Sequence, residues 1–283
     1  MKTIRDASLM QQDAEAARLR GSRLALVPTM GALHDGHVAL LRAARERADL
    51  VILSVFVNPT QFGKGEDYER YPRDIDRDSA IARDAGADVL FVPSNEQMYE
   101  KGFQSFVTVE KLSAPFEGES RPGHFQGVAT VVAKLLNITK PHLAVFGQKD
   151  AQQAVVVRRM IRDLNFDVEL LIVPTVREAD GLAMSSRNAY LSPRERGEAA
   201  VLSASLRKAE ELIRSGERRV DAVVGAMRGM ISLSSSGAID YIAIADADSL
   251  ARLEHLQTGQ DILVALAVRF GKTRLIDNIQ ITT

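Results

Sequence analysis

The first segment with residue types suited to catalysis or ligand binding contains two histidines three residues apart. His34 and His37 belong to the segment Met30–His37, which follows the apolar run Leu24–Val27 and precedes an expected helix over Val38–Ala48. Free N–H groups at a strand-to-helix turn bind anions, glycine lets the backbone approach a ligand, and imidazole donates hydrogen bonds to phosphate oxygens. The segment therefore indicates a phosphate site, and a plain turn with two surface histidines is the alternative.

Polar groups of a different kind follow the next apolar run, Leu50–Val57. The side-chain amides of Asn58 and Gln61 both donate and accept hydrogen bonds, which suits the hydroxyl or carboxylate groups of a ligand. Taken alone, Asn58 is explained as well by an Asn-Pro turn. Further on, the glycine-rich loop Glu119–Gly127 either carries Arg121 over a bound anion or is an ordinary solvated loop.

Two later segments also contain groups that suit phosphate. Gly147–Asp150 follows an apolar run, and a lysine after a strand-end glycine is typical of a phosphate contact, whereas Asp150 is explained by helix capping. Gln153 faces the same side of the expected helix one turn later. Met184–Arg187 combines two hydroxyls with a guanidinium, which suits a polyphosphate, although an ordinary turn has the same composition.

The elements that must position these segments are buried strands that alternate with amphipathic helices. Five short runs are apolar on both faces, as in a covered parallel sheet: Leu24–Val27, Leu50–Val57, Val89–Val92, Leu143–Phe146 and Val168–Val173. Apolar residues recur at helical spacing over Val128–Leu136 and Ala154–Leu164. This alternation predicts an α/β fold with an open, doubly wound parallel sheet, whose ligands bind at the carboxyl ends of the strands.

The pattern changes after about Pro174 and predicts a smaller carboxyl-terminal α+β domain. A serine N-cap, a proline and a glutamate begin a helix at Ser192–Glu195. Helices are expected over residues 198–214 and 220–231, followed by antiparallel strands over 239–245, 261–270 and 274–281. We place the two domains at residues 1–175 and 176–283.

The composition excludes several classes of protein. With 283 residues, 46% hydrophobic and 26% charged, the chain is neither disordered nor collagen-like, and its net charge of −1 provides no field that attracts nucleic acid or an anionic membrane. The absence of cysteine rules out disulfides and thiol nucleophiles and fits the reducing cytoplasm. The first twenty residues lack the apolar core of a secretory signal, and the longest apolar stretch is short of the roughly 20 residues of a membrane helix.

Six segments, taken in order, resemble those of the pantothenate synthetase family, a branch of the nucleotidyltransferase superfamily. They are residues 28–37, 56–62, 71–73, 121–125, 147–150 and 184–187. The resemblance implies a Rossmann-like amino-terminal domain, a smaller domain that covers the active site, and a magnesium-dependent, cytoplasmic homodimer. It also implies the reaction: (R)-pantoate and β-alanine are joined at the expense of ATP through pantoyl adenylate, which yields pantothenate, AMP and pyrophosphate.

The resemblance further implies which residues bind ATP. They are Met30, Gly31, Ala32, Leu33, His34, Asp35, Gly36, His37, Gly147, Gln148, Lys149, Asp150, Val176, Met184, Ser185, Ser186 and Arg187. Among them His37 would be the proton donor, and His34 and Lys149 would stabilise the charge that develops on the leaving pyrophosphate.

The same resemblance assigns the other ligands. Gln61 would bind both pantoate and β-alanine, and Gln153 would bind pantoate. Some family members carry adjacent acids near the metal, and here only Asp78 matches them because residue 77 is arginine. The resemblance therefore assigns Asp78 to Mg²⁺.

Two other functions stay open at this point. An adenylyltransferase that transfers AMP to a phosphorylated acceptor would share the fold and the histidine segment, but the amides of Gln61 and Gln153 favour an uncharged hydroxy acid. A non-catalytic nucleotide sensor would have degraded catalytic positions, and here they are intact. Acyl transfer through an adenylate needs no protein nucleophile, in agreement with a chain that contains no cysteine.

Overall fold

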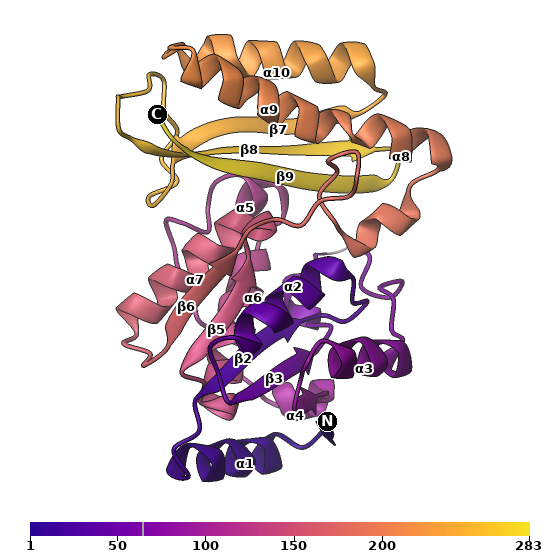
Figure 1. The fold of residues 1–283 in the computed structure, drawn as a ribbon, viewed down its shortest axis with the longest axis vertical. Helices are drawn as coiled ribbons and strands as arrows, with labels where there is room; N and C mark the ends of the chain where they lie inside the picture. The colour runs from indigo at the N-terminus through magenta and orange to yellow at the C-terminus, as the bar shows by residue number, and fades with distance from the viewer. Residues whose placement is uncertain (64) are drawn as a thin grey trace. The chain divides into compact units, whose positions relative to one another are not determined.

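A six-stranded parallel sheet forms the centre of the amino-terminal part of the chain (Figure 1). The computed structural model describes residues 1–63 and 65–283, without the side chain of residue 234. The strands are β1 (Lys2–Ile4), β2 (Leu24–Thr29), β3 (Leu50–Val55), β4 (Val89–Phe91), β5 (Leu143–Gly147) and β6 (Glu169–Val173). All neighbours in the order β1-β4-β3-β2-β5-β6 are parallel, so the predicted doubly wound α/β sheet is confirmed.

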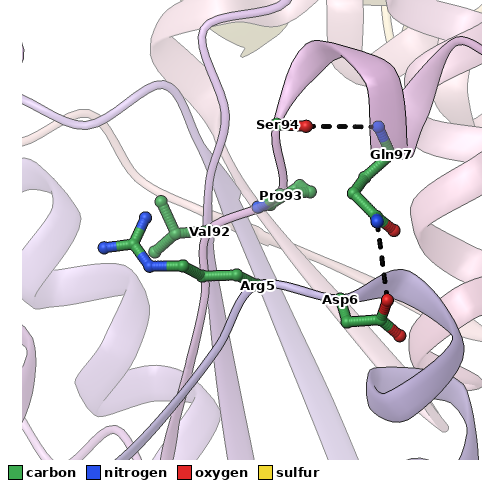
Figure 2. Close-up of a pocket in the computed structure, with 6 residues that line it drawn as sticks. All are labelled: Arg5, Asp6, Val92, Pro93, Ser94 and Gln97. Atoms are coloured by element: carbon green, nitrogen blue, oxygen red, sulfur yellow. Dashed lines mark hydrogen bonds between the residues drawn. The ribbon is translucent and has the colours of Figure 1, made fainter.

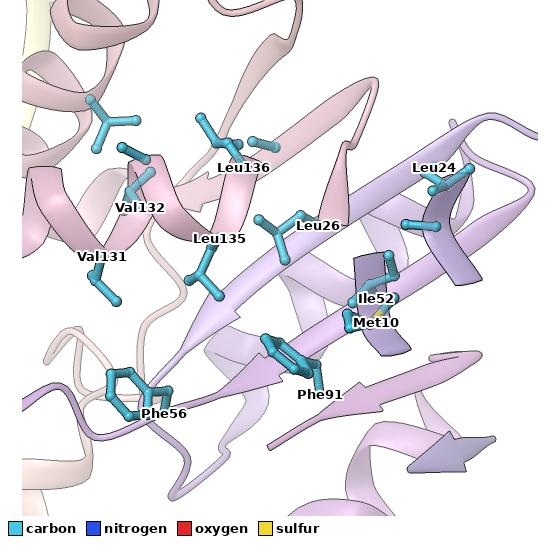
Figure 3. Packing of buried hydrophobic residues seen from close by; sticks show 14 of the residues in the cluster. Met10, Leu24, Leu26, Ile52, Phe56, Phe91, Val131, Val132, Leu135 and Leu136 are labelled. Atoms are coloured by element: carbon cyan, nitrogen blue, oxygen red, sulfur yellow. The ribbon is translucent and has the colours of Figure 1, made fainter. Parts of the chain in front are cut away.

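Helices cover both faces of this sheet. They are α1 (Ala7–Leu19), α2 (Asp35–Arg45), α3 (Ile75–Asp84), α4 (Asn95–Met98), α5 (Glu117–Ser120), α6 (His124–Thr139) and α7 (Ala151–Asp163), with the 3₁₀ turns η1 (Pro59–Gln61) and η2 (Gln148–Asp150). Alternate residues of β2 point to opposite sides, so Leu26 packs with α1 and α6 whereas Val27 packs with α2 and α3. Figure 3 shows the first of these two cores, in which Leu26 of the sheet lies near Leu135 of α6 and Ile52 lies beside Met10 of α1. Burial on both faces is the reason that the sequences of the central strands β2, β3 and β5 are mostly apolar.

The strand order also indicates where a ligand would bind. From β2 the chain proceeds to β3 and β4 on one side, and it later crosses to β5 and β6 on the other. The order therefore reverses between β2 and β5, and ligands of open α/β sheets bind beyond the carboxyl ends of the strands at such a point. The histidine segment follows β2, and Gly147 ends β5.

The remainder of the chain forms a second compact unit of helices and antiparallel strands. It contains η3 (Ser186–Tyr190), α8 (Pro193–Ala199), α9 (Val201–Arg214), α10 (Val220–Ser234), β7 (Ala238–Asp246), β8 (Asp261–Phe270) and β9 (Thr273–Thr282). The sheet order is β7-β8-β9, and α9 and α10 pack against it around one apolar core, which confirms the expected α+β character (Figure 1). The predicted helix start is also confirmed, because Ser192 and Glu195 form a reciprocal capping box.

The limits of the two units differ from the boundary drawn from the sequence. One unit comprises Met1–Gly147 and Gln152–Pro174, and the other comprises Gln148–Ala151 and Thr175–Thr283. The short segment Gln148–Ala151 belongs to the second unit because its backbone is hydrogen-bonded to β9, a contact between distant parts of the chain that no local pattern encodes. Within residues 1–63 and 65–283, no helix has both the length and the apolar character needed to cross a membrane.

Candidate functional site

The two histidines of the segment Met30–His37 form a reciprocal cap at the start of α2. The backbone N–H of Gly36 donates to Nδ1 of His34 at 3.1 Å, and the N–H of His34 donates to Nδ1 of His37 at 3.3 Å. The two rings lie 4.2 Å apart between centroids. Because each Nδ1 accepts a hydrogen bond, each neutral ring carries its hydrogen on Nε2. Both imidazoles are therefore Nε2–H donors at the N-terminus of α2, which is the positive end of the helix dipole.

Asp78 lies beneath the backbone of this segment. Its carboxylate is 1% exposed and accepts hydrogen bonds from the N–H groups of Ala32 and Leu33, both at 2.8 Å. Ala32 has a φ of +52°, an uncommon value for a residue with a side chain, so the hydrogen bond that its N–H donates to Asp78 stabilises a strained conformation. A Cβ added to Gly31, whose φ is +83°, would lie 2.8 Å from Oδ2 of Asp78. The close approach therefore requires glycine at residue 31.

These contacts differ from those expected of a magnesium ligand at Asp78. Both carboxylate oxygens face backbone N–H groups instead of a cluster of other acids. In the described part of the chain, no group of three or more His, Cys, Asp or Glu side chains is arranged to hold a metal ion. The sequence could not reveal this, because the bonds join residues that are 45 and 46 positions apart.

Gln61 is oriented by a neighbouring amide and reaches the histidine segment. Nδ2 of Asn58 donates to Oε1 of Gln61 at 3.1 Å, so the nitrogen of Gln61 must point the other way, where it lies 3.0 Å from Sδ of Met30. Thioether sulfur is a weak acceptor. The structure therefore brings Gln61 to the predicted edge of the sheet with its N–H groups directed toward the segment that follows β2.

Asn58 itself has a structural role, in agreement with the Asn-Pro turn considered above. Its Oδ1 accepts hydrogen bonds from the hydroxyls of Thr60 (2.9 Å) and Tyr99 (2.8 Å), and its Nδ2 also donates to the carbonyl of Gly127 at 3.1 Å. Burial raises the pKa of Tyr99, which keeps its hydroxyl a donor. A Cβ on Gly127 would lie 2.4 Å from the carbonyl oxygen of Thr60, so glycine allows α6 to pack directly on η1.

Arg121 takes part in the support of Gln61. It donates to both carboxylate oxygens of Glu66 at 2.7 Å and to the carbonyl oxygen of Gln61 at 3.3 Å. Nη1 of Arg121 lies 3.1 Å from Nε2 of His124, and because guanidinium only donates, Nε2 accepts and Nδ1–H donates to the carbonyl of Gln61 at 2.8 Å. Burial, together with the charge of Arg121, lowers the pKa of His124 to about 4. In the structure Arg121 pairs with Glu66, and several residues of its loop are exposed.

The predicted glutamine of α7 has a buried neighbour that the sequence analysis missed. Gln153 is partly buried, whereas Gln152 is 6% exposed and donates to the carbonyls of Leu112 (3.0 Å) and Pro115 (2.7 Å). The N–H of Glu117 in turn donates to Gln152 at 3.1 Å. Gln152 therefore orders the chain before α6, and Gln153 stays the candidate for ligand binding.

The predicted ATP-binding residues of the second unit lie in two ordered segments. The N–H of Met184 donates to the carbonyl of Val176 at 3.0 Å, and the hydroxyl of Ser185 accepts from the N–H of Arg187 at 3.3 Å and caps η3. In η2, Nζ of Lys149 lies 3.5 Å from Oδ1 of the adjacent aspartate. Within this unit the structure thus brings Val176 and Met184 together.

A separate hollow lies at the ends of β1 and β4 (Figure 2). Gln97 donates from Nε2 to Asp6 at 3.4 Å, and its oxygen accepts from the N–H of Ala7 at 3.0 Å. Asp6 also caps α1, and Ser94 caps α4. In Figure 2 Arg5 points away from this group. Asp6 and Ser94 thus have a structural role at the starts of two helices, and none of the predicted site residues lines the hollow.

Comparison with known proteins gives full-length matches. The family model described as Pantoate-beta-alanine ligase matches residues 2–280. The pantothenate synthetase of Chloroherpeton thalassium is 52% identical over 99% of this chain and 99% of its own, and that of Moorella thermoacetica is 52% identical over 99% and 98%.

Solved structures agree with these matches. A pantothenate synthetase structure from Thermus thermophilus shares 47% identity with a TM-score of 0.93, and the similarity covers 100% of both chains. The pantoate-beta-alanine ligase of Francisella tularensis, solved in complex with beta-gamma ATP and beta-alanine, shares 32% identity with a TM-score of 0.79 and covers 99% of this chain and 97% of that one.

Proposed function

The chain belongs to the pantoate-beta-alanine ligase family, and from this premise we propose that it joins (R)-pantoate to β-alanine at the expense of ATP. The observation that carries the proposal is the pair of Nε2–H donors at the start of α2, with the N–H groups of Gln61 directed toward the same segment. One group of donors suits the phosphates of ATP, and the other suits a hydroxy acid.

The reaction needs ATP because a carboxylate is a poor acyl donor. A carboxylate oxygen of pantoate attacks the α-phosphorus, the bond to the bridging oxygen breaks, and pyrophosphate leaves with the electron pair. The neutral amine of β-alanine then attacks the acyl carbon of pantoyl adenylate, and AMP leaves with the electron pair of the acyl–oxygen bond. The nitrogen gives up a proton to solvent as the amide of pantothenate forms. Neither step requires a protein nucleophile, so the protein acts by positioning the reactants and stabilising charge.

We assign four side chains to the stabilisation of the charge that develops on pyrophosphate. His34 and His37 donate hydrogen bonds from Nε2 to this charge. The resemblance also makes His37 the proton donor, a role that requires protonation at Nδ1 as well, in place of the hydrogen bond that this atom accepts from His34. Lys149 and Arg187 supply fixed positive charge. The other ATP contacts proposed are the remaining residues of Met30–His37 and Gly147–Asp150 together with Val176, Met184, Ser185 and Ser186.

Gln61 and Gln153 are the proposed contacts for the acid substrates. Because Asn58 occupies the oxygen of the Gln61 amide, Gln61 acts as a donor toward the hydroxyl or carboxylate of pantoate and toward β-alanine. Gln153, partly buried on α7, is the second proposed contact for pantoate. A donor rather than a cation at this position favours a hydroxy acid with a single carboxylate over the more highly charged phosphorylated acceptor of an adenylyltransferase.

The described residues do not fit a magnesium ion held by the protein alone. Asp78 directs both carboxylate oxygens to backbone N–H groups, and no group of three potential ligands occurs within residues 1–63 and 65–283. Mg²⁺ is commonly held by substrate phosphates and water with few protein ligands. We therefore propose that Mg²⁺ enters as the complex with ATP and that Asp78 acts on the backbone of the histidine segment.

Further proposals follow from the family resemblance. We propose that residues 1–175 bind nucleotide and pantoate, that residues 176–283 contribute further ATP contacts, and that the enzyme works in the cytoplasm as a homodimer without nucleic acid or membrane as a partner. Light scattering of the purified protein tests the dimer through its mass in solution.

A product assay tests the proposed function. The purified protein is incubated with ATP, Mg²⁺, pantoate and β-alanine, and the products are identified by mass spectrometry. Pantothenate, AMP and pyrophosphate in equal amounts are expected, with none formed when pantoate is omitted. Transfer of AMP to a phosphorylated acceptor, or binding of ATP without turnover, would instead support the adenylyltransferase or the nucleotide sensor.

A further inference from the structure

The turn that contains Lys149 is held by one side chain of β9. Asn278 donates its two Nδ2 hydrogens to the carbonyl oxygens of Gln148 at 3.0 Å and Lys149 at 2.9 Å, and its Oδ1 accepts from Nε2 of Gln148 at 3.1 Å. Because carbonyl oxygens only accept, the amide of Asn278 has one possible orientation. A single buried side chain, 4% exposed, thereby fixes two consecutive carbonyl groups of η2.

Asn278 is itself firmly placed. It pairs with Ala265 of β8, and its N–H donates to Oδ1 of Asp277 at 2.8 Å. The side chain of Asp277 is fully buried and receives two hydrogen bonds from Arg177, at 2.6 and 3.0 Å. Such bidentate charge-assisted pairs are the strongest and most directional hydrogen bonds in proteins. The carbonyl groups of η2 therefore cannot shift without disturbing β9.

The same part of β9 supports the other proposed ATP segment of this unit. Arg177, held by Asp277, donates from Nη1 to the carbonyl of Gly181 at 3.0 Å. The residue before it, Val176, accepts the N–H of Met184. Both segments of the second unit that we assign to ATP are therefore anchored to two consecutive residues of one strand.

We propose that Asn278 is a positioning residue for the ATP-dependent step, acting through the backbone of Gln148 and Lys149. The inference rests on the proposed function, in which the ammonium of Lys149 stabilises the leaving pyrophosphate. A lysine side chain is flexible, so the position of its ammonium group depends on how precisely the backbone that carries it is held. The side chain of Lys149 is 22% exposed. A misplacement of about 1 Å in a catalytic group lowers rates by on the order of 100-fold.

The test uses substitutions that remove the two donors of Asn278. Asn278→Asp keeps the shape of the side chain but directs a carboxylate oxygen at two carbonyl oxygens, and Asn278→Ser is a second variant that avoids this repulsion. Gln280→Ala, at an exposed position of the same strand, is the matched control. We expect pantoate-dependent exchange of pyrophosphate into ATP to fall by roughly 10- to 100-fold at saturating substrate in both Asn278 variants. The KM for pantoate and the rate of the control should stay within about twofold.

A double substitution separates positioning from general damage to the fold. If Asn278 acts through Lys149, adding Asn278→Asp to Lys149→Ala should slow exchange by less than about threefold beyond Lys149→Ala alone, because coupled residues are not additive. If the reductions in exchange rate of the two single variants multiply in the double variant, the inference about Asn278 is wrong. Normal exchange rates in the Asn278 variants would also overturn it, and in both cases the proposed function stands. A normal rate for Lys149→Ala alone would overturn both the inference and the role of Lys149. Absence of pantothenate formation by the unaltered enzyme would instead contradict the proposed function itself.

Discussion

Asn58 donates a hydrogen bond to Oε1 of Gln61 at 3.1 Å, so Gln61 presents only N–H groups to a ligand. The relation depends on the closeness of α6 to η1, because Nδ2 of Asn58 also binds the carbonyl of Gly127 at 3.1 Å. Gln61 is a proposed substrate contact, and the orientation of its amide thus depends on Asn58, which need not touch the substrate.

Asn58→Asp should reverse the orientation of the Gln61 amide. A carboxylate at residue 58 repels Oε1 of Gln61 and accepts from its nitrogen, so the amide rotates and its oxygen faces the ligand. An unpaired buried polar group costs about 1–3 kcal/mol, so the KM for pantoate should rise by roughly 5- to 150-fold. The KM for ATP should change little. Steady-state kinetics with each substrate varied in turn measure both effects.

The matched control for this variant is Gln97→Ala, which removes an amide from the hollow at the ends of β1 and β4 (Figure 2). It should leave both KM values unchanged. Equal increases in the KM values for ATP and pantoate in Asn58→Asp would contradict the assignment of Gln61 to the acid substrates.

Asp78→Asn should act on stability and not on the requirement for magnesium. The amide keeps one acceptor but directs N–H groups at the N–H of Ala32 or Leu33, which leaves a buried donor unpaired. We expect the free energy of unfolding to fall by about 1–3 kcal/mol, measured by denaturant titration. The Mg²⁺ concentration for half-maximal activity should be unchanged at saturating ATP. Unchanged stability with a strongly increased magnesium requirement would show that Asp78 is a metal ligand after all.

His124 should make the folded state sensitive to acid. The pKa of His124 is about 4 in the folded protein because of burial and the charge of Arg121, against an ordinary value of 6.5. Between these two pH values the unfolded chain binds a proton that the folded chain does not. The stabilising contribution of neutral His124 is therefore fully present above pH 6.5 and is lost as the pH falls toward 4. The contribution of His124 to the free energy of unfolding is at most about 3 kcal/mol.

Substitution of this histidine provides the measurement. The side-chain N–H of His124→Asn can still donate to the carbonyl of Gln61, but the side chain does not titrate. The free energy of unfolding of the variant should therefore fall less between pH 7 and pH 5 than that of the unaltered protein. Parallel curves for the two proteins would mean that His124 is not buried as a neutral ring.

The strands and helices that pack against each other were predictable because their packing leaves a local pattern. The apolar runs of β2, β3 and β5 and the apolar stripe of α6 follow from burial on two faces or on one. β1 was missed, since only one of its three residues is buried. A strand that short at the edge of a sheet carries no pattern that differs from a loop.

The contacts within the site were predictable only in part. The positions of His34 and Gln61 followed from the rule that ligands bind at the ends of parallel strands. The contacts of Asp78 and Asn278 join segments far apart in the chain, which no local spacing encodes. A signal for the contact of Asn278 did exist, because Asp277 and Asn278 are two consecutive polar residues between the apolar residues Ile276 and Ile279 of β9.

The most direct test of the two-step account is exchange of labelled pyrophosphate into ATP without β-alanine. If pantoyl adenylate forms first, the enzyme with ATP, Mg²⁺ and pantoate should exchange label, and omission of pantoate should stop the exchange. His37→Ala should slow it by on the order of 100- to 1,000-fold, as expected for loss of one donor that stabilises developing charge. Exchange that strictly requires β-alanine, or that proceeds without pantoate, would contradict the adenylate mechanism.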